Sequence, residues 1–256
     1  MFLFALFPVV LPAVAIVVAV TAVIGASKKD RERSEVWARW AAARGWGYLP
    51  MWPQMTRAHV GGPFGRGGSR RADRGFWGNF DRVPVFGFRY RYTVSNGKSS
   101  QTYTFLVAGV RFPGTNFPSL SLKRESGILF GRDKDLQFEN QQFNETWHVK
   151  SASPKFAHDV MHPRAMEYFM GPLPYFEQLW FSGDTLFASV KGDPDPLHVD
   201  AHLRMLTKFV SLLPAHMLRE LRAQRFTPDL SGPGVRLEEQ QRRMRHLEVR
   251  WAHPRR

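Results

Sequence analysis

The pattern of apolar and polar positions divides the chain into an apolar N-terminal segment, a body with strand and helix periodicities, and a polar C-terminal stretch. From Phe2 to Ala26 no residue is charged, and fifteen positions are Phe, Leu, Ile or Val. A helix of these 25 residues is about 37 Å long, which exceeds a hydrocarbon core of about 30 Å. Pro8 and Pro12 are compatible with it because membrane helices tolerate proline. We therefore predict a transmembrane helix over residues 1–26.

A cleaved signal peptide is the alternative interpretation of this segment. Such a peptide has a positive region followed by an apolar core of about 7–15 residues. Here the apolar run is longer, and no charged side chain precedes it. The sequence therefore favours an uncleaved anchor.

Basic residues lie on one side of the predicted span. No Lys or Arg precedes it, and six follow within twenty residues: Lys28, Lys29, Arg31, Arg33, Arg39 and Arg44. Because Lys and Arg accumulate on the cytoplasmic side of a membrane helix, we expect the rest of the chain to be cytoplasmic at the cell membrane. Lys28, Lys29, Arg31 and Arg33 are the candidate contacts with anionic lipid, each worth about 1 kcal/mol near the surface.

Strand periodicity dominates the first half of the body. Phe86, Phe88, Tyr90 and Tyr92 alternate with Arg89 and Arg91, which is the pattern of a strand buried on one face and solvated on the other. Asn96-Gly97 predicts a hairpin to residues 101–112. Further strands are expected over 119–122, 136–140 and 147–150, and a hairpin over 176–192 turns at 182–184. These elements predict an antiparallel meander.

Helical spacing and capping residues predict the remaining elements. Ser34 and Gly45 would cap a short helix whose tryptophans, Trp37 and Trp40, pack either at the membrane interface or on the domain core. Ser153-Pro154 opens a helix with a break at 161–163 and a continuation to about 170. Amphipathic helices follow over 196–213 and 215–224.

Together these elements predict an α+β fold, with helices over 154–170 and 196–223 on an antiparallel sheet of about five to seven strands. The predicted organisation is a span over 1–26, a basic segment with a short helix over 27–53, an α+β domain over 54–225, and a basic linker with a C-terminal helix or tail over 226–256.

Composition removes several classes of function. The chain has no Cys, which excludes a disulfide scaffold, Cys-ligated zinc and thiol catalysis. Its formal charge is +14, and Arg is concentrated in residues 56–75 and 219–256. Such segments are compatible with nucleic acid, but a neighbouring anionic membrane explains them at least as well. We rank nucleic-acid binding last.

Few constellations suggest chemistry. His158/His162 and His198/His202 have the i, i+4 spacing of zinc ligands, and Asp200 lies within the second pair, although surface or capping histidines have the same spacing. The Gly- and Arg-rich residues 61–75 predict a loop but fit no phosphate-binding fingerprint. No nucleophile elbow occurs. The sequence therefore predicts no cofactor and a non-catalytic domain. A metal-dependent enzyme using His198, Asp200 and His202 is the alternative.

A series of short motifs carries a resemblance. Phe138-Glu139, Phe143-Asn144, Trp147-His148-Val149, Phe156-Ala157 and His162-Pro163-Arg164 stand in the order FE…FN..WHV…FA…HPR. This pattern resembles an uncharacterised family of single-pass membrane proteins common in actinobacteria. The resemblance implies a membrane anchor and an α+β domain, and it supplies no catalytic residue. Taken as packing, the motif predicts Phe138, Phe143, Trp147 and Val149 as core residues. The expected function is a membrane-anchored domain that binds a protein or anionic lipid.

Overall fold

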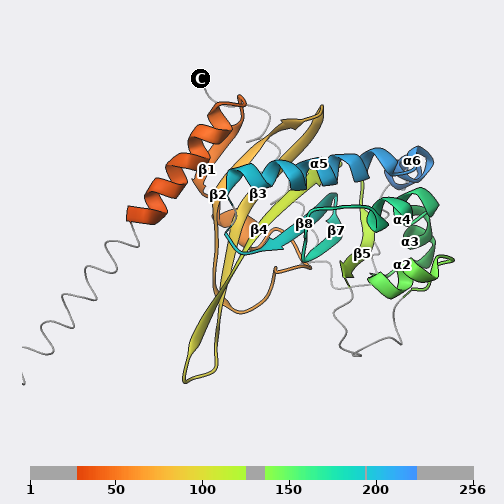
Figure 1. Cartoon of the computed structure of the whole chain (residues 1–256), viewed down its shortest axis with the longest axis horizontal. Helices are drawn as coiled ribbons and strands as arrows, with labels where there is room; N and C mark the ends of the chain where they lie inside the picture. Colours follow the sequence, from red (N-terminus) through yellow and green to blue (C-terminus); the bar gives the residue numbers. More distant parts are fainter. Residues whose placement is uncertain (1–27, 125–135, 194, 224–256) are drawn as a thin grey trace, which may run out of the picture. The chain divides into compact units, whose positions relative to one another are not determined.

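The computed structural model describes residues 28–124, 136–193 and 195–223 (Figure 1). They belong to a compact unit that ends at Leu221, apart from the first two residues of a second unit, Arg222–Arg256. The predicted span over 1–26 and the C-terminal segment over 226–256 lie outside the described residues. Within the described part of the chain, no helix is long and apolar enough to cross a membrane.

The centre of the fold is one eight-stranded sheet in which neighbouring strands are antiparallel, so the predicted α+β class is confirmed. Its order is β1-β2-β3-β4-β8-β7-β5-β6. The strands are β1 (Gly47–Met51), β2 (Gly68–Phe80), β3 (Val83–Ser95), β4 (Ser100–Arg111), β5 (Phe117–Arg124), β6 (Trp147–Ser151), β7 (Gln178–Gly183) and β8 (Thr185–Lys191).

The strand order corrects the predicted meander. Strands β1 to β4 are sequential neighbours, but β4 pairs next with β8, and β5 lies between β7 and β6. Strand periodicity specifies which residues share a face, but it does not specify which distant strand completes the ladder. The β7–β8 hairpin turns at Gly183, as predicted, with a φ of +60°.

Helices cover the sheet on one face (Figure 1). The capped start at Ser153, the break at His162 and the interruption at Pro214 are confirmed. Residues 136–140, expected to form a strand, have no regular secondary structure. The Asn140 side chain accepts a hydrogen bond from the Phe143 amide at 3.0 Å and caps the helix that follows. The helices are α2 (Gln141–Thr146), α3 (Pro154–Val160), α4 (Pro163–Met170), α5 (Pro196–Leu212) and α6 (Ala215–Ala223).

The N-terminal helix, residues 28–42, begins before the predicted cap at Ser34. Ser34 lies inside it, and its hydroxyl is 2.6 Å from the Tyr48 hydroxyl on β1. The end near Gly45 is as predicted, since this glycine has a φ of +66°. Trp37 and Trp40 are buried against Phe76, which decides between the two expected positions in favour of the core.

The structure places no domain boundary between residues 53 and 54. β1 pairs with β2, and the N-terminal helix contributes to the same apolar core as α5. Residues 28–53 are therefore part of the α+β fold, and the separate segment predicted over 27–53 does not describe them. The core also contains the predicted residues Phe138, Phe143, Trp147 and Val149.

The opposite face of the sheet carries a second core, which we call the aromatic face. It is covered by residues 52–64, which include the 3₁₀ helix η1 (Pro53–Thr56). Its members are mostly large rings from β3, β4, β7 and β8. The buried residues are Trp52, Met55, Phe64, Ala72, Phe86, Phe88, Tyr90, Tyr92, Phe105, Val107, Trp180 and Phe187.

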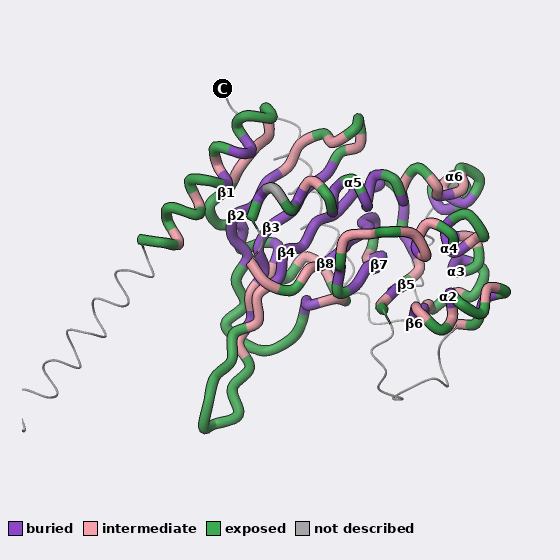
Figure 2. The backbone as a smooth tube through the Cα atoms, in the orientation of Figure 1, coloured by how far each residue is buried: buried purple, intermediate pink, exposed green. Residues whose placement is uncertain are grey.

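Strand β3 is buried on both faces along much of its length (Figure 2). Phe88 and Tyr90 belong to the aromatic face, as the alternation predicts. Arg89 points away from them but is only 5% exposed. The expectation that the arginine side of β3 is solvated is therefore wrong, because helices and loops cover it.

The predicted loop over residues 61–75 is correct only as far as Gly67. β2 begins at Gly68 and continues to Phe80. Glycine suits this strand because a Cβ atom on Gly75 would overlap the ring of Trp52. Two charged residues of the segment, Asp73 and Arg74, suit it because they form ion pairs with side chains elsewhere in the fold.

Candidate functional site: an ion-pair network under the N-terminal helix

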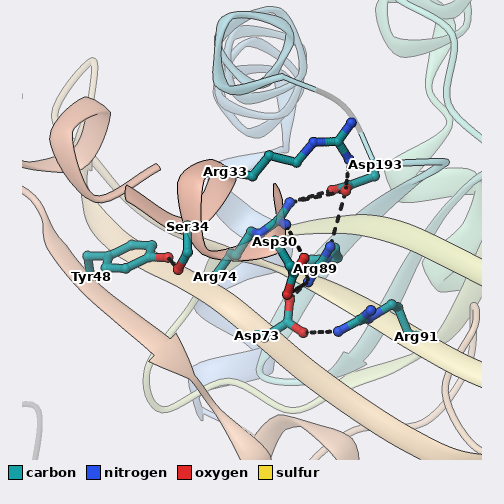
Figure 3. A network of polar contacts seen from close by, with 9 residues as sticks. All are labelled: Asp30, Arg33, Ser34, Tyr48, Asp73, Arg74, Arg89, Arg91 and Asp193. Atoms are coloured by element: carbon teal, nitrogen blue, oxygen red, sulfur yellow. Dashed lines mark hydrogen bonds and ion pairs between the residues drawn. The ribbon is translucent and has the colours of Figure 1, made fainter. Parts of the chain in front are cut away.

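Seven charged side chains from four parts of the chain meet on the helix-covered face of the sheet, at the end of the N-terminal helix where Asp30 lies (Figure 3). We call this set the clamp. Three are carboxylates and four are guanidinium groups. Its members are Asp30 and Arg33 of the N-terminal helix, Asp73 and Arg74 of β2, Arg89 and Arg91 of β3, and Asp193, which follows β8.

A β-bulge supplies two of these side chains. Asp73 pairs with Arg89 and Phe76 with Gly87, so β2 advances three residues while β3 advances two. Arg74 lies within this bulge and has a φ of +50°. The extra residue lets consecutive side chains, Asp73 and Arg74, reach the same face of the sheet, where a regular strand would separate them.

Arg89 is the centre of the clamp because it contacts all three carboxylates. Its Nε donates to Asp73 at 2.5 Å, and its terminal nitrogens donate to Asp30 at 2.9 Å and to Asp193 at 3.1 Å. Arg74 donates to Asp30 at 2.5 Å and to Asp193 at 2.8 Å. The planar guanidinium fork suits such multiple recognition.

Two peripheral arginines complete the charge pairing. Arg91 donates to the second oxygen of Asp73 at 2.6 Å, and Arg33 donates to Asp193 at 2.9 Å. The Arg33 side chain is half exposed, whereas those of Asp73, Arg74 and Arg89 are almost completely buried. The clamp therefore runs from a closed interior to the protein surface.

Burial and pairing oppose each other in the clamp. Burial alone would lower the pKa of Arg89, but hydrogen bonding to Asp73 and the charges of Asp73, Asp193 and Asp30 raise it. Burial would likewise raise the pKa of Asp30, but Arg89, Arg74 and Arg91 hold it below its ordinary value. These groups are therefore charged, and removing one buried partner leaves another without compensation.

A pocket of about 660 Å³ lies beside the clamp, between the N-terminal helix and strands β1, β2 and β3. The clamp contributes Asp30, Asp73, Arg74 and Arg89 to its lining. Additional charged residues line it from the helix and from β2, namely Arg31, Glu35 and Arg71. Ser34 and Tyr48 supply hydroxyl groups, and Ala38, Pro50 and Met51 supply an apolar part. The volume is within the range of small-molecule sites, roughly 300–1,000 Å³.

Comparison with solved structures gives one informative likeness. The structure matches the crystal structure of the mycobacterial trehalose monomycolate transport factor A, TtfA, with a TM-score of 0.52 and 15% sequence identity. The fold is similar to that of TtfA. The match covers 72% of this chain and 97% of the TtfA chain. At this identity the likeness to TtfA concerns the fold and not its activity.

Sequence comparisons add no family. No protein-family model matches the chain, and no curated protein matches it. The resemblance to an actinobacterial membrane-protein family thus stays a prediction. Because the likeness to TtfA concerns the fold alone, it assigns no chemistry to this protein.

The predicted lipid contacts lie on the N-terminal helix. Lys28, Lys29 and Arg31 are exposed there, so all three are accessible to an anionic partner. Arg33 is also exposed in part, but one of its nitrogens is committed to Asp193. The same helix thus presents basic side chains outward and holds Asp30 inward.

The structure does not bring His198, Asp200 and His202 together as metal ligands. The two ring nitrogens of His202 lie 2.8 and 2.9 Å from the carbonyl oxygens of His198 and Tyr175. Asp200 accepts from Arg44 at 2.6 Å. No cluster of three or more potential metal ligands occurs among the residues that the structure describes.

The other histidine pair also has structural contacts. His162 Nε2 is 2.9 Å from the Leu212 carbonyl oxygen, and the His158 ring packs against Phe138 with ring centroids 5.0 Å apart. The Asn144 side-chain amide bonds local backbone, because its oxygen accepts from the Phe138 amide at 2.9 Å and its nitrogen donates to the Phe138 carbonyl oxygen at 2.7 Å. The motif residues in this region therefore have packing and capping roles.

The Arg-rich segment over 56–75 is only partly a free basic surface. Arg74 is buried in the clamp, and Arg70 donates to the carbonyl oxygens of Gly65 and Arg66 at 2.7 and 3.0 Å. Most of the other Arg-rich segment, 219–256, lies outside the described residues. The described part thus offers fewer free arginines to nucleic acid than the sequence count suggests.

Sequence reasoning missed the clamp, although one signal for it exists. Asp73 and Arg74 stand in a segment that reads as a loop, and Arg89 and Arg91 read as solvated strand residues. Aromatic residues alternating with arginine in β3, beside a neighbouring strand that carries an acid, indicate a cross-strand ion pair. Nothing in the sequence indicates that Asp30 and Asp193 join it.

Proposed function

We propose that this protein is a membrane-anchored, non-catalytic domain held close to the cytoplasmic surface of the cell membrane, where it binds anionic lipid or a protein partner. The observation that carries the proposal is the clamp between Asp30 and the sheet arginines Arg74 and Arg89. Asp30 stands four residues after the apolar segment ends. Four residues of helix are about 6 Å long, so the domain has no room for a long tether.

A short, clamped connection has a functional consequence. A domain on a long linker explores many orientations, whereas this one would present the same face to the membrane. The exposed residues Lys28, Lys29 and Arg31 then lie beside the lipid headgroups. Their attraction to anionic lipid, about 1 kcal/mol for each charge, supports the lipid part of the proposal.

Vesicle binding tests the lipid part. We expect a variant lacking residues 1–26 to float with vesicles that contain phosphatidylglycerol at low salt and to dissociate at high salt, because screening weakens surface attraction. A triple Gln variant at Lys28, Lys29 and Arg31 should bind less. The control variant carries Gln at three exposed basic positions of other helices and removes the same amount of charge. These positions are Arg164 on α4, Lys208 on α5 and Arg219 on α6. Failure of the truncated protein to bind anionic vesicles even at low salt contradicts the lipid part.

Cysteine labelling tests the orientation, since the chain has no native Cys. Lys98 is exposed in the turn that joins β3 to β4. We expect Lys98→Cys to react with a membrane-impermeant maleimide only after the cells are permeabilised. Labelling in intact cells would place the domain outside and overturn the cytoplasmic assignment.

A further inference from the structure

The pocket beside the clamp is lined in part by charged side chains that take no part in the clamp. Arg74 and Arg89 are paired with Asp30, Asp73 and Asp193, as described above. Arg31 and Arg71 also line the pocket, but their side chains form no hydrogen bond or ion pair with any other described residue. The pocket lining contains four arginines and three carboxylates, so it has a surplus of positive charge. The carboxylates are Asp30, Glu35 and Asp73.

A buried donor in the same pocket lacks an acceptor. Arg74 is 2% exposed, and its Nε–H has no hydrogen-bond partner within the described part of the chain. An unsatisfied buried donor costs about 1–3 kcal/mol. An oxygen-rich anion bound in the pocket would supply the missing acceptor and would pair with Arg31 and Arg71.

The remaining lining suits hydroxyl groups and a small apolar part. Ser34 and Tyr48 present hydroxyls that are 2.6 Å apart, and Glu35 lines the pocket without an ion-pair partner among the described residues. Carboxylates and hydroxyls accept hydrogen bonds from sugar or glycerol hydroxyls. Pro50 and Met51 form an apolar wall, and Met51 is 42% exposed.

We propose that this pocket binds a phosphate ester of a hydroxylated small molecule. Arg31 and Arg71 form ion pairs with the phosphate. The groups that contact the hydroxyls of the ligand are Ser34, Tyr48 and Glu35. The proposal rests on the proposed function for one point, the source of the ligand. Arg31 stands five residues after the predicted span, about 7 Å along a helix. That distance matches the depth of the headgroup layer, about 5–7 Å on each side of the bilayer.

Calorimetry on the full chain in nonionic detergent tests the pocket itself. The probes are sn-glycerol 3-phosphate, inorganic phosphate and glycerol. We expect saturable binding of glycerol 3-phosphate, weaker binding of inorganic phosphate and none of glycerol. Arg31→Gln and Arg71→Gln should each weaken glycerol 3-phosphate binding about tenfold, because each removes a charge-assisted hydrogen bond.

Arg39→Gln is the matched control. Arg39 lies on the same helix as Arg31 and is exposed, but it does not line the pocket. Binding should change less than twofold in this variant, and all three variants should keep the wild-type melting temperature because the substituted side chains are exposed. An equal loss in Arg39→Gln and Arg31→Gln, or no saturable binding of either phosphate, overturns the inference.

Nanodiscs distinguish a lipid headgroup from a free phosphate ester. A lipid that occupies the pocket should compete with glycerol 3-phosphate in discs containing phosphatidylglycerol, but not in discs with the same fraction of oleate, which adds charge without a phosphate ester. Equal affinity in both kinds of disc, with the pocket variants still weakened, identifies a soluble phosphate ester as the ligand and supports the pocket.

The two proposals can fail separately. If the truncated protein ignores anionic vesicles while the pocket binds glycerol 3-phosphate with the expected variant response, the lipid part of the proposed function fails and the pocket inference stands. If vesicle binding is retained while neither phosphate binds, the pocket inference fails and the proposed function stands.

Discussion

The two faces of β3 carry out different tasks with adjacent residues. Phe88 and Tyr90 pack among the rings of the aromatic face, where contacts are numerous and weakly directional. Arg89, between them, contacts three carboxylates from three different parts of the chain. Apolar packing stabilises the sheet in general, whereas the clamp specifies where one helix and one loop attach to it.

The largest effect is expected from breaking the clamp at its centre. Arg89→Ala should lower the free energy of unfolding by about 3–5 kcal/mol, because Asp73 remains buried without its main partner. Urea unfolding of the full chain in detergent measures this. The double variant Arg89→Met with Asp73→Leu should come within about 1 kcal/mol of the wild type, since an apolar pair removes the uncompensated charge. A double variant as unstable as Arg89→Ala would mean that the clamp itself stabilises the fold.

Conservative substitutions sharpen the comparison of the two faces. Arg89→Lys should cost about 1.5–3 kcal/mol, because one ammonium group cannot contact all three carboxylates as a guanidinium fork does. Phe88→Leu should cost less than about 1.5 kcal/mol, because it keeps an apolar side chain of similar size. Thermal unfolding in the same detergent compares them. If Phe88→Leu costs more stability than Arg89→Lys, the aromatic face tolerates a conservative substitution less well than the clamp does.

The same contrast explains what could be predicted from the sequence. The rings of β3 have a period of two, so their shared face was predictable, and the capping residues Ser153 and Gly45 marked helix ends because those signals are local. The clamp depends on Asp30 and Asp193, 163 positions apart, and on the bulge that turns Arg74 toward them. Such contacts are set by strand order, and local patterns do not encode the pairing of β4 with β8.

A smaller effect is expected at the exposed end of the clamp. The Asp30 side chain is 49% exposed, so Asp30→Asn should reduce global stability by no more than about 1 kcal/mol. Hydrogen exchange should nevertheless accelerate in residues 28–36, because Asp30 ties this end of the helix to Arg74 and Arg89. Glu32→Gln, an exposed change on the same helix, is the control. Equal exchange in the two variants would mean that Trp37 and Trp40 alone hold the helix.

The smallest effect is the acid response of the clamp. The pKa of Asp30 is lower in the folded protein than in the unfolded chain, where it is about 4. Asp30 therefore contributes stability that is fully present above about pH 4 and is lost as pH falls through the lower, folded pKa. We expect the melting-temperature difference between the wild type and Asp30→Asn to be constant from pH 7 to about pH 5 and to shrink below about pH 4. Phe88→Leu should show no such convergence, because Phe88 packs among the rings of the aromatic face and not against Asp30. A difference that persists unchanged at pH 2 would show that the Asp30 contacts do not depend on its charge.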